Sequence, residues 1–213
     1  GYYLEKSYSY DIISVLFNNN DLFLSSSNSV QWYNASNLQY INSYNHGNAS
    51  TGTVMVINPN NSKLYVYYKE TYGDNVIDII YVSPDNFQLI DQVTDLPIID
   101  AIDGAYDQQN NLVFFGGVAQ QNSGIVFLID NLHDVIGTYS VPLVMRITYN
   151  NNNGLTYASG TYITSFSGNN FLGTIGIDAL ADEIVVNESN NDIGVVSIDG
   201  GSTRIFDHSL SFV

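Results

Sequence analysis

The chain has 213 residues, with 21 acidic and only 5 basic side chains, and its formal net charge at pH 7 is −16. This charge excludes a basic groove for nucleic acid and argues against binding to anionic lipid surfaces. No run approaches the ~20 apolar residues of a membrane-spanning helix. The absence of cysteine excludes a thiol nucleophile, a thiolate zinc site and a disulfide framework.

The acidic balance reflects a shortage of lysine and arginine, because 21 carboxylates are an ordinary number for this length. Asparagine is abundant, with runs at 18–20 and 150–153. A polar surface made of amides and hydroxyls depends little on ion pairs, which suits an acidic exterior. We therefore expect an acid-stable extracellular protein of archaeal-like composition. A protein that is simply poor in lysine remains the alternative.

The chain begins at Gly1 and not at Met, so we expect that a signal sequence was removed or that the chain was shortened. Four N-glycosylation sequons lie in polar, loop-like stretches. Their acceptor residues are Asn34, Asn48, Asn60 and Asn187. Together with the lack of cysteine and the few charges, these sequons favour a secreted glycoprotein.

Short segments rich in Val, Ile, Tyr and Phe follow one another along the chain, each bounded by Asn, Asp, Gly or Ser, and helical periodicity is nearly absent. This pattern is typical of β-strands. In chain order the predicted strands are 14–17, 21–24, 54–57, 63–68, 76–82, 112–115, 124–129, 143–149, 184–186 and 193–198. Regular short strands with turn signals predict an all-β sandwich, barrel or propeller.

One pattern recurs: an apolar strand, a turn rich in Asn or Asp, and a second apolar or aromatic strand. Its clearest copy is 54–66, with others at 13–24, 104–114 and 145–157 and a weaker one at 177–186. The apolar residues that align after the turn are Leu22, Leu64, Leu112, Leu155 and Ile184. Their spacings are 42, 48, 43 and 29 residues. The first three fit a propeller blade of ~40–50 residues.

The segment 54–90 contains Ile57-Asn-Pro-Asn-Asn-Ser-Lys-Leu-Tyr-Val and then Asn75-Val-Ile-Asp-Ile-Ile. It resembles a YVTN-type β-propeller repeat, in which an Asn-Pro hairpin precedes a hairpin of the form Val-x-Val-Ile-Asp. Similar second elements begin at Gly124 and Asn191. The resemblance implies a small β-propeller of about five four-stranded blades, in a family whose members are often surface or secreted proteins of archaea and bacteria. The alternative is a β-sandwich built from hairpins with an exchanged terminal strand.

We expect one all-β repeat domain over 1–213. Both chain ends have strand-like patterns: the segment 1–10 is rich in tyrosine, and the segment 204–213 alternates over Leu210 and Phe212. Two roles are open for them. They pair with each other and close a ring, which removes sheet edges, or one of them pairs with the next subunit.

Catalytic constellations are scarce. There is no Gly-x-Ser-x-Gly motif, and the histidines at 46, 133 and 208 are scattered. Asp100 and Asp103 would line a propeller channel as an acid/base pair, although turn and strand-end aspartates are the simpler interpretation. We therefore predict no enzyme, no cofactor and no metal site.

The aromatic residues allow a further hypothesis. Trp32-Tyr33 lies beside a sequon, and Tyr65, Tyr67 and Tyr68 share one hairpin. Exposed aromatic rings near amides stack on sugars, as in lectins. More often such residues form the packed core between blades.

The leading hypothesis is a non-enzymatic extracellular module, a structural or adhesive subunit of a cell surface, surface layer, filament or virion. Its expected partners are other surface proteins or copies of itself, with glycans as a further class, and neither nucleic acid nor membrane insertion. The alternatives are a lectin-like propeller and a glycoside hydrolase that uses Asp100 and Asp103.

Overall fold

The computed structural model describes residues 12–47, 49, 53–71, 73–119, 123–177, 180–197, 201–207 and 209–211. These residues form nineteen β-strands. None of them belongs to a helix that could cross a membrane. The chain divides into two compact units, Gly1–Leu96 and Pro97–Val213, and each is described by itself.

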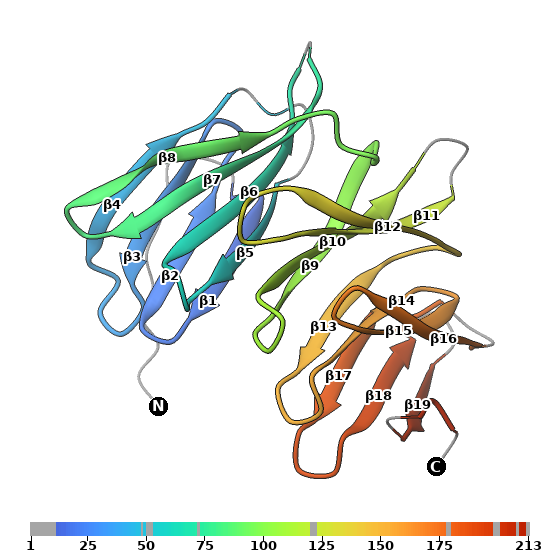
Figure 1. Cartoon of the computed structure of the whole chain (residues 1–213). Helices are drawn as coiled ribbons and strands as arrows, with labels where there is room; N and C mark the ends of the chain where they lie inside the picture. Colours follow the sequence, from blue (N-terminus) through green and yellow to red (C-terminus); the bar gives the residue numbers. More distant parts are fainter. Residues whose placement is uncertain are drawn as a thin grey trace. The chain divides into compact units, whose positions relative to one another are not determined.

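The first unit contains two antiparallel four-stranded sheets (Figure 1). Within each sheet the strands lie side by side in chain order, so consecutive strands pair. Sheet 1 comprises β1 (Ser14–Asn18), β2 (Asp21–Ser25), β3 (Ser29–Asn34) and β4 (Tyr40–Asn45). Sheet 2 comprises β5 (Val54–Asn58), β6 (Lys63–Lys69), β7 (Asn75–Ser83) and β8 (Asn86–Val93).

The second unit contains three antiparallel sheets with the same sequential pairing. Sheet 3 comprises β9 (Asp100–Asp107), β10 (Leu112–Val118), β11 (Gly124–Ile129) and β12 (Val135–Val141). Sheet 4 comprises β13 (Arg146–Asn150), β14 (Leu155–Ser159), β15 (Tyr162–Ser167) and β16 (Asn170–Gly176). Sheet 5 comprises β17 (Glu183–Asn187), β18 (Asp192–Ser197) and β19 (Ser202–Phe206), three strands where the other sheets have four.

The sequence pattern found the first two strands of the sheets better than the last two. Of the third strands, β3 and β15 were not predicted, although most of their residues are buried. The fourth strands β4, β8, β12 and β16 were not predicted either, and their residues are mostly exposed or half-buried. Outer strands of this kind carry Asn, Ser, Thr and Gly and need no apolar run, so composition does not reveal them. The middle strands have the opposite property: β11 is buried at all six positions. This explains its continuous apolar sequence.

The loop between the first two strands is built alike in sheets 2 to 5. The residue that ends the first strand is an Asn or Asp, and its Oδ1 accepts a hydrogen bond from a loop backbone N–H at 2.9–3.1 Å. These residues are Asn58, Asp107, Asn150 and Asn187. The last loop residue has a positive φ in each case, at Ser62, Asn111, Gly154 and Asn191. The prediction that Asn, Asp and Gly make these turns is confirmed.

The register expected for the fifth copy is wrong. Ile184 lies on β17, the first strand of sheet 5, and pairs with Val195 of β18. Leu155 pairs with Asn150 at the end of the first strand of sheet 4, and the equivalent residue of sheet 5 is Asp192, which pairs with Asn187 and lies 37 residues further along the chain. The true turn is Asn187 to Asn191, which has the same side-chain hydrogen bond as the others. The 29-residue spacing thus came from misalignment by one strand.

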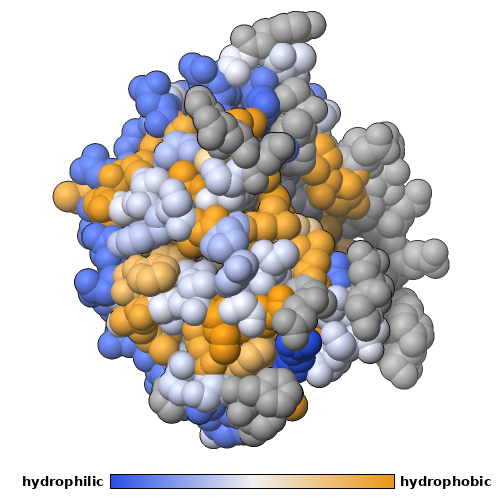
Figure 2. Space-filling model, turned by 90° about the vertical axis from the view of Figure 1, so that its right-hand side faces the viewer, coloured by the Kyte–Doolittle hydropathy of each residue, from blue (hydrophilic) through white to orange (hydrophobic). Residues whose placement is uncertain are grey.

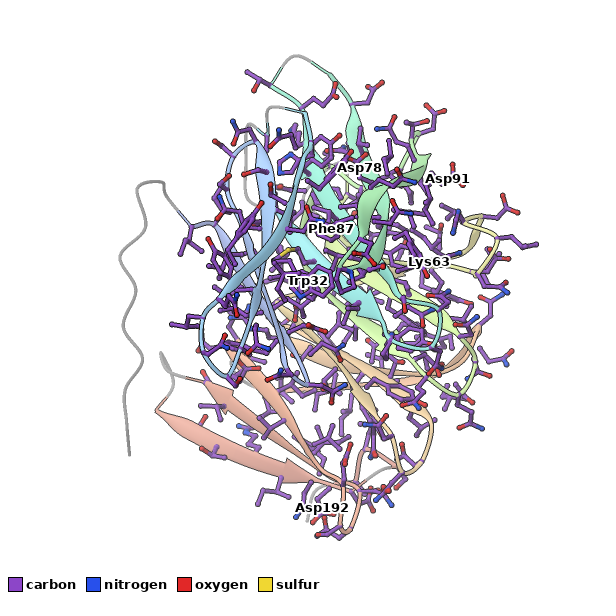
Figure 3. The ribbon with its side chains drawn as sticks, turned by 90° about the vertical axis from the view of Figure 1, so that its left-hand side faces the viewer. Trp32, Lys63, Asp78, Phe87, Asp91 and Asp192 are labelled. Carbon is purple, nitrogen blue, oxygen red and sulfur yellow. The ribbon has the colours of Figure 1, made fainter. Side chains whose placement is uncertain are left out.

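Each unit has its own apolar core. In the first unit, Trp32 of β3 lies beside Phe87 of β8, with ring centroids 5.6 Å apart, and both contact Phe23 (Figure 3). In the second unit, one cluster joins sheets 3 and 4 around Phe114 and Phe166. A second cluster joins sheets 4 and 5. Sheets therefore pack face to face within each unit.

The predicted terminal strands are only partly tested. Residues 1–10 lie outside the described residues, as do 208, 212 and 213. The strand expected over 204–213 is instead β19, which ends at Phe206. After it the chain turns, because Asp207 Oδ1 accepts hydrogen bonds from the backbone N–H groups of Ser209 and Ser211. Leu210, with φ 63°, closes this turn.

Candidate functional site

The outer edge of sheet 5 is the most distinctive surface of the second unit. β19 pairs with β18 on one side, and no described strand pairs with it on the other. Ile205 on this strand is 47% exposed. On neighbouring sheet 4, the outermost strand β16 exposes Phe171 and Leu172. An open strand edge beside exposed apolar side chains is a surface that proteins usually cover.

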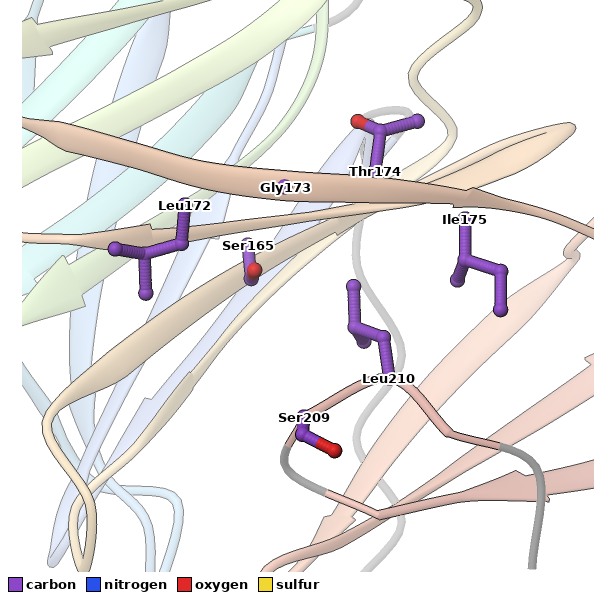
Figure 4. A pocket seen from close by; sticks show the side chains of 7 residues that line it. All are labelled: Ser165, Leu172, Gly173, Thr174, Ile175, Ser209 and Leu210. Carbon is purple, nitrogen blue, oxygen red and sulfur yellow. The ribbon is translucent and has the colours of Figure 1, made fainter.

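A pocket of about 350 Å³ opens beside β16 (Figure 4). Its wall combines residues of β15 and β16 with the turn that follows β19. A Cβ atom placed on Gly173 would meet no other atom within 4 Å, which shows how open the strand is here. The lining residues are Ser165, Leu172, Gly173, Thr174, Ile175, Ser209 and Leu210.

The turn after β19 holds one wall of this pocket in place. Asp207 Oδ1 accepts three hydrogen bonds, from Ser209 N, Ser209 Oγ and Ser211 N, at 2.7–2.9 Å. Leu210 N donates to Asp207 O at 3.0 Å. The Leu210 side chain is therefore fixed in the apolar cluster between sheets 4 and 5, where it is 7% exposed.

In two other pairs of adjacent sheets, the fourth strand of one sheet contacts the turn before the fourth strand of the next. Between sheets 1 and 2, Asn42 Nδ2 of β4 donates to Pro84 O, in the turn before β8, at 3.2 Å. Between sheets 3 and 4, Tyr139 Oη of β12 donates to Asn169 Oδ1, in the turn before β16, at 2.7 Å. Between sheets 4 and 5 the pocket occupies this position among the described residues. Among the described residues, therefore, no fourth strand of sheet 5 lies at this position.

A buried carboxylate forms the most concentrated polar cluster of the first unit. Asp78 of β7 is 1% exposed and accepts hydrogen bonds from Tyr44 Oη at 2.9 Å and from Gln92 Nε2 at 2.8 Å. Burial and the neighbouring Asp78 charge raise the pKa of Tyr44 and of Tyr68 above 10.0. Because Tyr44 belongs to sheet 1 and Asp78 to sheet 2, the cluster joins the two sheets.

His46 lies at the margin of the same cluster. Its ring stacks on Tyr68 with centroids 4.7 Å apart, and its Nδ1 lies 2.6 Å from Gly47 O. Burial lowers the pKa of His46 below its ordinary 6.5. The sequence reasoning overlooked Asp78, although a lone carboxylate between Ile77 and Ile79 indicates a buried acid that needs partners.

The expected carboxylate pair lies on β9, the first strand of sheet 3, which contacts β13 of sheet 4. Asp103 Oδ2 accepts a hydrogen bond from the backbone N–H of Ile147 at 2.8 Å. Burial raises the pKa of Asp103 above 3.8, against the hydrogen bonds from Ile147 and Gly104. Asp103 therefore ties β9 to β13. Asp100 is half-buried at the start of the strand, and no described cluster of acids or histidines could hold a metal ion.

The aromatic residues considered for sugar stacking belong to the core. Trp32 is 5% exposed, and its Nε1 donates to Asp21 Oδ1 at 2.8 Å. Tyr33, Tyr65, Tyr67 and Tyr68 are also buried. The core interpretation of these residues is confirmed, and they offer no exposed ring to a ligand. Of the three histidines, His46 is in the core, His133 lies in the turn before β12, and His208 lies outside the described residues.

The described sequons lie in a turn or at the end of a strand, Asn60 in the β5–β6 turn and Asn34 and Asn187 as the last residues of β3 and β17. Asn60 and Asn187 are exposed, Asn34 is half-buried, and Asn48 lies outside the described residues. At Asn34 and Asn187 the side-chain Oδ1 accepts the hydroxyl hydrogen bond of the sequon serine, at 2.6 and 2.7 Å. The Nδ2 atom, which would carry a glycan, is the other end of each amide. Their glycosylation stays a prediction.

Figure 2 shows strongly hydrophilic residues mainly along one margin, with weakly polar and hydrophobic residues mixed across the rest of that face. One described ion pair joins Arg146 of β13 to Glu183 of β17, at 3.5 Å. Exposed pairs of this kind contribute little to stability.

Comparison with solved structures identifies the architecture. The chain superposes on a chain from the crystal structure of the mitotic checkpoint complex with a TM-score of 0.78 and 14% identity, over 96% of this chain and 63% of that one. It superposes on the WD40 domain of Toxoplasma gondii coronin with a TM-score of 0.69 and 10% identity, over 91% and 55%. The chain has a β-propeller fold. Its five sheets are the blades that the repeat pattern predicted.

A third match has a different function. The chain superposes on Kuenenia stuttgartiensis hydrazine synthase with a TM-score of 0.72 and 7% identity, over 90% of this propeller chain and 69% of that one. Because one match is an enzyme, the fold alone leaves the question of activity open. The propeller spans less than two thirds of the checkpoint and coronin chains. No protein-family profile and no curated protein sequence matches it.

Proposed function

We propose that this propeller is a non-enzymatic extracellular glycoprotein module, a structural or adhesive subunit of a cell surface, surface layer, filament or virion. Its partners are other surface proteins or copies of itself. The observation that carries the proposal is the outer edge of sheet 5, where no described strand pairs with β19 and the turn after β19 borders a pocket.

Strand addition is the mode of contact that this edge supports. A further strand would extend sheet 5 along the outer side of β19, where no described strand pairs with it, and alternate side chains of that strand would enter adjacent pockets. The pocket beside Leu172 and Leu210 is in position to receive them. Exposed Ile205 and Phe171 add apolar surface, which gains about 25 cal/mol per Å² when covered.

The strand we propose is residues 1–10 of a neighbouring copy. Two described outer strands contain a tyrosine between small polar residues, in Ser43-Tyr44-Asn45 and in Thr138-Tyr139-Ser140. Tyr44 and Tyr139 pack against the apolar clusters of their units. The segment 1–10 repeats the pattern in Ser7-Tyr8-Ser9. Its sequence therefore matches the kind of outer strand that is not among the described strands of sheet 5.

The extracellular location is supported by composition and by sequon exposure. The net charge of −16 arises with only five basic residues, no cysteine is present, and Asn60 and Asn187 are exposed. A surface rich in amides keeps its hydrogen bonds in acid, where ion pairs lose their carboxylate charge.

Oligomeric state tests the proposal. Light scattering and electron microscopy of the full chain should show dimers or polymers, and a chain that starts at residue 12 should be monomeric. Leu172→Lys places a charge at the pocket and should also give monomers. Leu89→Lys, on outer strand β8 of the other unit, is the matched control because Leu89 is 42% exposed and Leu172 54%. A wild-type monomer near 23.5 kDa, or assembly that survives Leu172→Lys, would refute it.

A further inference from the structure

We propose that a second pocket, in the turns of sheets 3 and 4, is a binding site for neutral carbohydrate. This pocket has a volume of about 420 Å³, within the ~300–1,000 Å³ range of small-molecule sites. It is lined by Gln108, Gln109, Tyr149 and Asn151. The inference is independent of strand addition at sheet 5, because it uses different turns and different residues.

The chemistry of the lining selects the ligand class. Three side-chain amides and one phenol surround the pocket, and none of the lining residues is charged. Each amide presents an N–H donor and a C=O acceptor side by side, which matches neighbouring sugar hydroxyls that both donate and accept. An anionic ligand would need lysine or arginine, and a metal ion would need free carboxylates. Neutral polyhydroxyl compounds therefore fit best.

The charged groups nearest to the pocket are already engaged. Asp107 is fully buried, and its carboxylate accepts hydrogen bonds from Asn110 N at 3.0 Å and from Asn110 Nδ2 at 2.9 Å. Glu188 Oε1 accepts from Asn151 Nδ2 at 2.8 Å. This bond leaves the Asn151 carbonyl oxygen as an acceptor for a ligand. The side-chain amide groups of Gln108 and Gln109 donate no hydrogen bond to other described residues.

The backbone around the pocket is held rigidly. Gln109 N donates to Tyr149 Oη at 3.0 Å, which fixes the β9–β10 turn against strand β13. Asn150 Nδ2 donates to Asn191 Oδ1 at 3.1 Å, which joins the turns of sheets 4 and 5. A site whose backbone is already ordered loses less entropy when it binds a ligand.

Gly154 shapes one side of the pocket. It has φ +68°, and a Cβ atom at this position would collide with Gln109 Oε1. The absence of a side chain therefore lets the Gln109 amide lie against the β13–β14 turn. Tyr149 is half-buried and supplies the aromatic ring that sugar sites commonly use for stacking.

Saturation-transfer NMR of the full chain with methyl glycosides of glucose, galactose, mannose and N-acetylglucosamine tests the site. Open sites of this kind bind with a Kd on the order of 1 mM, so titration extends to about 10 mM. At least one glycoside should bind, and Gln108→Ala and Asn151→Ala should each weaken it about 5- to 10-fold. Gln88→Ala, an exposed glutamine on β8, is the control and should leave Kd unchanged.

Three outcomes would overturn the inference. The first is that no glycoside in the panel binds. The second is that Gln108→Ala and Asn151→Ala bind as tightly as Gln88→Ala, which would place the sugar elsewhere. The third is that methyl glucuronide binds as tightly as the neutral glycosides. The proposed site should bind this anion more weakly, because none of the lining residues is cationic.

Discussion

Removal of the Asp78 carboxylate should destabilise the first unit strongly. In Asp78→Ala, Tyr44 Oη and Gln92 Nε2 lose an acceptor that lies within 2.9 Å of each. A hydrogen bond to a charged group contributes about 1.5–3 kcal/mol. The variant no longer has to bury a charged carboxylate, and this gain offsets part of the free energy lost with the two hydrogen bonds. The expected decrease in the free energy of unfolding is therefore about 3–5 kcal/mol. At this chain length that loss lowers Tm by about 10 °C.

Fluorescence of Trp32 is the suitable assay, because it is the only tryptophan and it packs between the two sheets that Asp78 joins. Urea unfolding followed at this residue reports the first unit. Tyr44→Phe alone should lower the free energy of unfolding by about 1–2 kcal/mol. This lies at the lower end of the range for a hydrogen bond to a charged group, because Tyr44 is only half-buried. In the Asp78→Ala background Tyr44→Phe should cost much less, because the bond is already absent.

Asp85→Ala is the control, since Asp85 is an exposed turn residue of the same sheet and should change stability by less than about 0.5 kcal/mol. The reasoning is refuted if Asp78→Ala is as stable as Asp85→Ala. It is also refuted if Tyr44→Phe costs the same with and without Asp78, because the two residues would then be uncoupled.

Three further predictions concern the dependence of stability on pH and the β13–β14 turn. The raised pKa values of Tyr44, Tyr68, Tyr149 and Tyr157 mean that the unfolded chain loses these protons first as pH rises above 10.0. Urea titrations should therefore show stability falling above pH 10, less steeply in Tyr44→Phe, and a flat profile would contradict this. The pKa of His46 is lowered in the folded protein, so the unfolded chain takes up this proton first as pH falls. The stability that neutral His46 contributes is therefore present above pH 6.5 and lost in acid. His46→Gln should accordingly lose less stability between pH 7 and pH 5 than wild type does. Gly154→Ala should cost about 1–2 kcal/mol in urea unfolding, because its φ is +68° and a Cβ would displace Gln109. An unchanged urea midpoint in Gly154→Ala would contradict this prediction, because the turn would then accept a side chain without strain.

The repeat and the fold class were readable from the sequence because the turns carry their own chemistry. Asn58, Asp107 and Asn150 each end a strand and accept a loop N–H, so the same residue types recur at the same position. The fifth copy was misplaced because Ile177 to Val186 also places an acidic pair between apolar residues. Periodicity alone does not separate these two alignments.

The exposed side chains, the contacts between sheets and the pockets could not be predicted from the sequence in the same way. Trp32 and Tyr33 looked available for sugars, but propeller strands between neighbouring sheets are buried on both faces, so alternation gives no sign of exposure. Asp103 looked like a candidate acid, and its actual partner, the backbone of Ile147, lies 44 residues away. Both pockets join segments that are distant in the sequence, and the sequence does not show that they meet.

The sequential pairing of strands has a consequence for how the protein acquires its structure. Every described strand pairs only with its neighbours in the chain, across short connections. Such local pairing keeps the contact order of each sheet low, and low contact order favours rapid folding. During synthesis each blade therefore has all its own strands as soon as its last residue leaves the ribosome. Sheet 5 is the one sheet with three described strands, and under the proposal above it is completed only when a second molecule supplies residues 1–10.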